Sequence, residues 1–161
     1  MLNKINILIS FVFCFISLLF TIINKDITIL LFSLVVIIPF ILKLKPIITF
    51  LYLIFSFIAL FLGCQLHFFR TIYWYDNFSH FIWGFLSSLL AILILKKFKK
   101  FDNLIFSCLF IFIFSLATSG LWEIFEFMVD NLFNGDMQRK ATGVYDTMKD
   151  IIITLFGNIL F

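Results

Sequence analysis

Long apolar runs alternate with short polar segments along the whole chain. The polar segments hold most of the charged residues, and most of the runs between them are long enough to cross a bilayer as helices. Charges, prolines and asparagines mark where one run ends and the next begins. The pattern predicts an all-α, polytopic transmembrane helical bundle with about six spans, in a single integral membrane domain covering 1–161. The expected spans are roughly 5–23, 27–42, 47–67, 77–96, 103–132 and 145–161.

Composition supports this class of protein. Hydrophobic residues make up 63% of the chain and charged residues 13%, and the mean hydropathy is +1.17. These values are far from those of soluble globular domains, so the lipid bilayer is the expected partner. The cations behind the formal net charge of +3 stand in short clusters between apolar runs. This arrangement is typical of charges that set membrane topology, and it predicts no nucleic-acid partner. The sequence leaves the oligomeric state open.

Positive charges are distributed unevenly between the two sets of helix connections. With six spans, one side would hold the lysines Lys4, Lys43, Lys45, Lys96, Lys97, Lys99 and Lys100. The other side would hold only Lys25, Arg70, Arg139 and Lys140. The positive-inside rule therefore predicts that both termini are cytoplasmic. The fourth and sixth helices would then begin at the outer face, where the fifth helix ends.

A first polar cluster opens the helix expected at 77–96. Asp76 and His80 are four residues apart, so they lie about 40° apart around a helix, and the carboxylate can orient the imidazole. A hydrogen-bonded packing histidine is the alternative interpretation of His80. Gly84 and Ser87 continue this face with small side chains that let a neighbouring helix approach closely.

A second polar cluster lies near the end of the helix expected at 103–132. Glu123, Glu126 and Asp130 share one face of that helix. Trp122 and other apolar residues surround the two glutamates, which are therefore expected near the outer interface or facing the bundle interior, where ionisable groups are usually functional. Asp130 is expected to be a solvated residue at the helix end.

A third polar cluster opens the helix expected at 145–161. Asp146 and Asp150 are again four residues apart. A helix cap is the alternative interpretation of Asp146, whereas Asp150 lies one turn inside the helix and needs another explanation. Lys149 can extend back toward the interface.

In this order, the three motifs resemble those of an uncharacterised family. Asp-x-x-x-His-Phe at 76–81, Glu-x-x-Glu at 123–126 and Asp-x-x-x-Asp at 146–150 are similar to the YjdF-like bacterial inner-membrane proteins. They are more distantly similar to the VanZ-like membrane proteins associated with glycopeptide-antibiotic resistance, which commonly have glutamine and asparagine in place of Glu126 and Asp150. The resemblance covers roughly 70–161 and implies a bacterial plasma-membrane location and a shared polar site.

Several enzyme classes are excluded because their motifs are missing. Two Glu-x-x-His pairs of a di-iron bundle and the His-Glu-x-x-His of a zinc protease do not occur in the sequence. The only prolines are Pro39 and Pro46, so the Pro-Ser-Gly-His motif of lipid phosphatases is also missing. No glycine-rich phosphate loop is present.

The polar clusters need a balancing cation. Two carboxylates about 4 Å apart repel each other by roughly 4 kcal/mol at an effective dielectric constant near 20. The cation can be a divalent metal, shared protons, or side chains from the outer loops. An oxygen-rich donor set with one imidazole suits Mg, Mn, Ca, Fe or Zn. The candidate catalytic residues are Asp76, His80, Glu123, Glu126, Asp146 and Asp150.

The sharpest hypothesis is a metal site. Its predicted ligands are His80, Glu123, Glu126 and Asp150, with Asp76 orienting His80 from behind. Arg139, Lys140 and Arg70 are the candidate substrate-binding residues, because cations beside a metal can clamp an anionic headgroup.

Three functions stay open, and the sequence does not decide whether the protein is an enzyme. A metal would indicate a membrane-embedded enzyme acting on an anionic lipid-linked or envelope substrate. Shared protons would indicate a proton-coupled transporter, although no internal repeat supports one. Fixed ion pairs would indicate a structural or interaction protein with a packed polar core.

Overall fold

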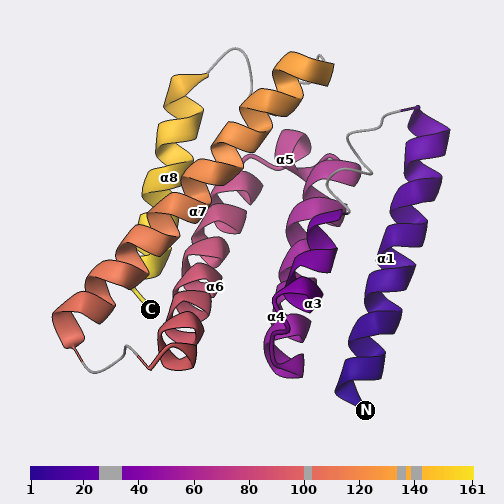
Figure 1. Cartoon of the computed structure of the whole chain (residues 1–161). Coiled ribbons are helices and arrows are strands. Elements are labelled where there is room, and N and C mark those ends of the chain that lie inside the picture. The colour runs from indigo at the N-terminus through magenta and orange to yellow at the C-terminus, as the bar shows by residue number, and fades with distance from the viewer. Residues whose placement is uncertain (26–33, 100–102, 134–136, 139–142) are drawn as a thin grey trace. The chain divides into compact units, whose positions relative to one another are not determined.

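The computed structural model of the chain is built from helices in its described residues, which are 1–25, 34–99, 103–133, 137–138 and 143–161 (Figure 1). The all-α prediction is confirmed for these residues. The chain divides into two compact units, Met1–Tyr75 and Asp76–Phe161. A single integral membrane domain over 1–161 stays a prediction.

The first unit contains two long helices, the second of which consists of an α-helical and a π-helical segment, and three short helical elements. Its elements are α1 (Leu2–Asn24), the 3₁₀ turn η1 (Val35–Ile37), α3 (Ile38–Ile41), α4 (Pro46–Ser56), the π-helical η2 (Phe57–Gln65) and α5 (Phe68–Thr71). Pro46 begins α4, a position where its missing N–H removes no helical hydrogen bond. Asn6 donates to the carbonyl oxygen of Pro46 at 2.7 Å, and Gln65 donates to the Ser17 hydroxyl at 2.6 Å. These hydrogen bonds join α1 to α4 and η2.

The second unit contains α6 (Tyr75–Lys97), α7 (Leu104–Phe133) and α8 (Val144–Ile159). The Asn103 side chain accepts the N–H of Phe106 at 3.0 Å and so caps the start of α7. Within this unit, the first turns of α6 and α8 lie toward the end where α7 finishes (Figure 1). The three polar clusters of the sequence therefore come from the same end of the unit.

Helices α6 and α8 touch through their glycines. A Cβ atom on Gly84 would collide with the carbonyl oxygen of Thr154, and one on Gly157 would collide with the carbonyl oxygen of Phe81. Small residues thus allow the two backbones to meet, as the sequence pattern predicts. Further down, Asn158 donates to the Ser88 hydroxyl at 2.6 Å.

Among the described residues, four helices are long and apolar enough to cross a membrane: Leu2–Asn24, Pro46–Gln65, Tyr75–Lys97 and Leu104–Phe133. The predicted count of about six spans is not confirmed. The described part of the second expected span, 27–42, is broken into η1 and α3, and residues 26–33 lie outside the described structure. Helix α8 has 16 residues, which makes it about 24 Å long, less than the roughly 30 Å of a bilayer core.

The outer surface of α7 is apolar. Leu104, Ile113 and Leu121 are all more than half exposed within the chain. A contiguous apolar surface of this kind is typical of helices that face lipid.

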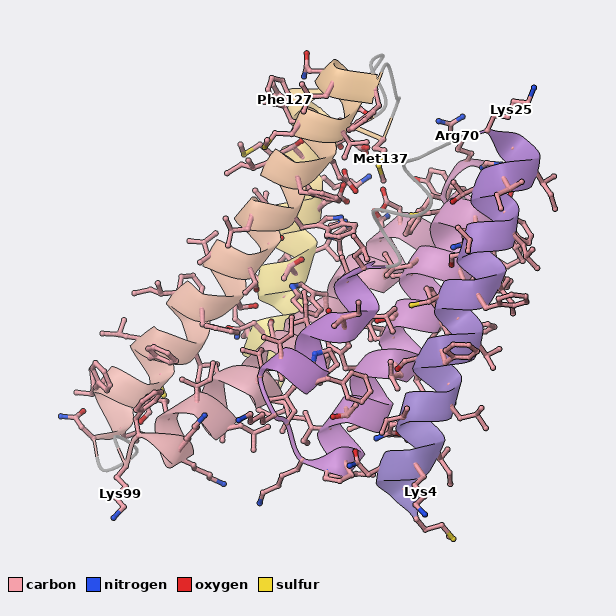
Figure 2. All side chains as sticks on the ribbon, turned by 45° about the vertical axis from the view of Figure 1, so that its right-hand side comes forward. Lys4, Lys25, Arg70, Lys99, Phe127 and Met137 are labelled. Atoms are coloured by element: carbon pink, nitrogen blue, oxygen red, sulfur yellow. The ribbon has the colours of Figure 1, made fainter. Side chains whose placement is uncertain are left out.

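Cations lie at both ends of the first unit and at one labelled end of the second (Figure 2). In the first unit, Lys4 lies at one end, with Lys25 and Arg70 toward the other (Figure 2). In the second unit, Lys99 lies opposite Phe127 and Met137 (Figure 2). The cytoplasmic location of both termini stays a prediction, because this distribution does not fix which end faces the cytoplasm.

Candidate metal centre

The imidazole of His80 is surrounded by carboxylates from three helices. Its Nε2 atom lies 3.6 Å from Oδ1 of Asp76 on α6, 3.9 Å from Oε1 of Glu123 on α7 and 3.9 Å from Oδ2 of Asp150 on α8. Asp76 reaches the ring because it stands one helical turn before His80. The contacts bring one member of each sequence cluster to a single nitrogen atom.

The other side of the His80 ring faces a hydroxyl. Oγ1 of Thr154 on α8 lies 3.4 Å from Nδ1, and the Ser119 hydroxyl on α7 donates to Thr154 at 3.2 Å. This contact orients the ring and leaves Nε2 turned toward the carboxylates. Asp76 was expected behind the ring, but it lies on the Nε2 side, and Thr154 takes the orienting position.

Asp76, His80 and Asp150 form a group that can hold a metal ion. One ligand atom from each of the three lies within 4.8 Å of the others. Around a cation bound at about 2.1 Å, neighbouring donors in an octahedron are about 3.0 Å apart and opposite donors about 4.2 Å apart. Small side-chain movements would therefore bring these three donors into a coordination sphere.

Two carboxylate oxygens around the His80 imidazole are buried without a hydrogen bond among the described residues, although one of them, Oδ1 of Asp150, lies 3.8 Å from Nζ of Lys149. They are Oε1 of Glu123 and Oδ1 of Asp150. Both side chains are about 95% buried or more. A buried acceptor without a donor is typically destabilising by about 1–3 kcal/mol, and more for a charged one, so such atoms usually have a ligand, ion or water.

A lysine borders the group on α8. Nζ of Lys149 lies 2.9 Å from Oδ1 of Asp146 and 3.8 Å from Oδ1 of Asp150. Asp146 is buried, and Gly143 occupies the cap position of α8. The alternative interpretation of Asp146 as a cap is therefore wrong, and its carboxylate instead pairs with Lys149.

Glu126 lies outside the group formed by Asp76, His80 and Asp150. Its Oε1 accepts the indole N–H of Trp122 at 2.8 Å, one turn earlier on α7. The ligand set predicted from the sequence was His80, Glu123, Glu126 and Asp150, whereas the group that can hold a metal ion contains Asp76 and neither glutamate.

The end of α7 holds polar residues that the sequence did not single out as part of a site. Asp130 is buried and accepts the backbone N–H groups of Met137 at 2.7 Å and Gln138 at 2.9 Å. Gln138 donates to the carbonyl oxygen of Glu123 at 3.1 Å and to the Thr147 hydroxyl at 3.2 Å. The expectation that Asp130 is solvated is wrong. The only sequence signal for this arrangement was its shared face with Glu123.

The described contacts do not test the candidate substrate-binding residues. Arg139 and Lys140 lie outside the described residues. Arg70 lies in α5 of the first unit. Their roles stay predictions.

The fold and these contacts define a helical membrane protein with a buried cluster of aspartate, histidine and glutamate. Residues 2–161 match the model of a family described as "Predicted membrane protein (DUF2238)". The chain belongs to this family. The predicted membership of an uncharacterised membrane family is thereby confirmed, whereas the finer YjdF-like and VanZ-like assignments stay predictions.

A curated protein of Thermotoga maritima, described as "Uncharacterized protein", is 32% identical over 97 residues. The match covers 60% of this chain and 50% of the relative, so the chain spans about half the length of that protein. No solved structure matches the chain.

Proposed function

We propose that the protein binds a divalent cation through Asp76, His80 and Asp150, and that the cation serves an enzyme reaction on an anionic lipid-linked or envelope substrate. One observation carries the proposal. Three carboxylates from three helices surround Nε2 of His80, and one of the oxygens that face this nitrogen, Oε1 of Glu123, is buried and accepts no hydrogen bond among the described residues.

A bound cation would offset the repulsion between these carboxylates. Carboxylates roughly 4 Å apart repel one another by roughly 4 kcal/mol per pair at an effective dielectric constant near 20. Lys149 compensates only part of this charge, because its closer partner is Asp146. A divalent cation at Nε2 of His80 would balance the charges of Asp76 and Asp150 directly and would attract the carboxylate of Glu123 through space.

The donor set supports Mg, Mn, Fe, Zn or Ca, all of which accept carboxylate oxygens with one imidazole or none. Three protein ligands leave room for a substrate or a water molecule, which is the arrangement of catalytic sites rather than closed structural ones. A cation in such a position polarises a phosphoryl or carbonyl oxygen. A site on membrane helices at the outer face of a bacterial plasma membrane would meet lipid-linked and envelope substrates.

A structural function is the second candidate, because hydrogen bonds between small polar side chains also join these helices. Ser87 and Ser115 are 2.8 Å apart between α6 and α7, and Asn158 joins α8 to Ser88. In this account the carboxylates and Lys149 only specify how the helices pack.

A cation titration separates the two functions. Melting temperatures of the purified full chain in detergent are measured against Mg, Mn, Ca, Fe and Zn, each in the micromolar to millimolar range. The proposal predicts a saturable rise for at least one cation in the wild type, which is lost in His80→Asn, because binding to the folded state stabilises it.

His67→Asn is the matched control. His67 is the other histidine of the chain, it is exposed, and its left-handed backbone conformation suits asparagine. This variant should keep the cation response. A wild type that responds to none of the five cations would support the structural function instead.

A further inference from the structure

Lys149 stands beside the cation group without belonging to it. Asp150 directs Oδ2 toward His80 and Oδ1 toward Lys149, at 3.9 Å and 3.8 Å respectively. Since the two oxygens of one carboxylate are about 2 Å apart, a cation at His80 and the Lys149 ammonium would be close neighbours. The Lys149 side chain is 28% exposed, whereas those of Asp146 and Asp150 are 6% and 5% exposed. The ammonium thus lies at the edge of the group, where a molecule can reach it from outside.

The charge around Lys149 is strongly negative without a metal. Among the described residues, the carboxylates of Asp76, Glu123, Asp146 and Asp150 surround a single ammonium group, that of Lys149. An anion approaching Lys149 alone would meet net repulsion from this set. With a divalent cation at His80, the same anion would contact two positive charges at once. Anion binding should therefore depend on the cation.

The separation of these two positive charges suits a group that carries several oxygens. A tetrahedral phosphoryl group has oxygens about 2.5 Å apart, so one oxygen can bind the cation while another accepts from the ammonium. Lysine commonly binds phosphate as a point charge, while the metal supplies directional bonds.

We propose that Lys149 is the anion-binding residue of this centre and that it receives a phosphoryl group only when a divalent cation is bound by Asp76, His80 and Asp150. The inference rests on the proposed function, because it requires that cation. The phosphoryl group can belong to a lipid headgroup or to free phosphate, and both present the same oxygens. Lys149 then exchanges part of its pairing with Asp146 for the incoming anion.

The experiment uses the purified full chain in dodecylmaltoside with the cation that stabilises it most. Melting temperature is measured against inorganic phosphate with and without the cation, and then against short-chain phosphatidic acid. Wild-type protein should respond to phosphate only with the cation present. A tighter response to phosphatidic acid assigns the phosphoryl group to a lipid, and equal responses assign it to free phosphate.

Lys149→Gln should weaken phosphate binding at least tenfold while changing cation binding less than threefold. Lys149→Arg should restore most of the affinity, because the charge returns. Lys97→Gln is the matched control, since it removes an exposed lysine at the opposite end of α6 from Asp76 and should leave phosphate binding unchanged.

Asp146→Asn provides a second test that does not depend on removing Lys149. It releases the ammonium from its closest partner, so phosphate binding should tighten. Unchanged phosphate affinity in both Lys149→Gln and Asp146→Asn, with cation binding intact, would overturn the inference. Loss of cation binding in the wild type is a different result, because it refutes the proposed function itself.

Discussion

The Thr154 hydroxyl and Nδ1 of His80 lie 3.4 Å apart, on the side of the ring away from the carboxylates. A partner of this kind fixes the orientation of a metal-binding imidazole, and its loss commonly lowers metal affinity by about 10- to 100-fold. We therefore expect Thr154→Val, which keeps the shape of the side chain, to weaken cation binding by about that factor.

Cation titrations followed by melting temperature measure the effect of Thr154→Val. Thr118→Val is the control, because Thr118 also bonds to a backbone carbonyl and a side chain, those of Ser115 and Trp83, away from His80. Equal cation affinity in both variants would show that Thr154 does not orient the ring.

The glycine contacts between α6 and α8 predict that alanine at Gly84 destabilises the fold, whereas alanine at Gly120 does not. Gly84→Ala places a methyl group against the carbonyl oxygen of Thr154, and we expect it to lower the free energy of unfolding by about 1–3 kcal/mol. Gly120→Ala is the control, because a Cβ there meets nothing within 4 Å and alanine favours the helix by roughly 1 kcal/mol. Denaturant unfolding in micelles compares the two variants. Similar stabilities would contradict the close packing.

The identity of the ligands can be tested by two carboxylate substitutions. Asp76→Asn should lower cation affinity at least tenfold, because Asp76 belongs to the group around His80. Glu126→Gln should leave it nearly unchanged, since glutamine keeps an oxygen that accepts the N–H of Trp122. Calorimetric titration of both variants measures this, and the reverse order of effects would restore the ligand set inferred from sequence.

Membrane orientation predicts which cysteines react in intact cells. In a background without Cys14, Cys64 and Cys108, we expect Val144→Cys at the start of α8 to react with a membrane-impermeant maleimide. Lys97→Cys at the end of α6 should react only after the cells are lysed. Both positions are exposed within the chain. Labelling at Lys97 instead would place the candidate metal centre at the cytoplasmic face.

Local patterns in the sequence account for much of the second unit. The expected helices 77–96, 103–132 and 145–161 begin within two residues of α6, α7 and α8 and end within two residues of them. Hydrophobic runs and charged boundaries determine such limits locally. Spacings of four residues likewise placed Asp76 near His80, because a single helical turn fixes that relation.

Contacts between helices could not be predicted from local patterns in the sequence. Thr154 and Gln138 are ordinary polar residues in the chain, and only packing brings them to His80 and Glu123. Asp130 is at the end of an apolar helix, where solvation was the natural expectation, yet the backbone of Met137 returns to it. Glu126 appeared equivalent to Glu123, because their different neighbours depend on how α7 is rotated toward α6 and α8.

Metal content is the most direct test of the central claim that this protein holds a divalent cation. Protein purified without chelators is analysed for Mg, Mn, Ca, Fe and Zn, both as isolated and after dialysis against each ion followed by removal of free metal. The account predicts about one equivalent per chain in the wild type and in His67→Asn, and a loss of that metal in His80→Asn and Asp76→Asn. Wild-type protein that retains none of these metals after either treatment would contradict the account.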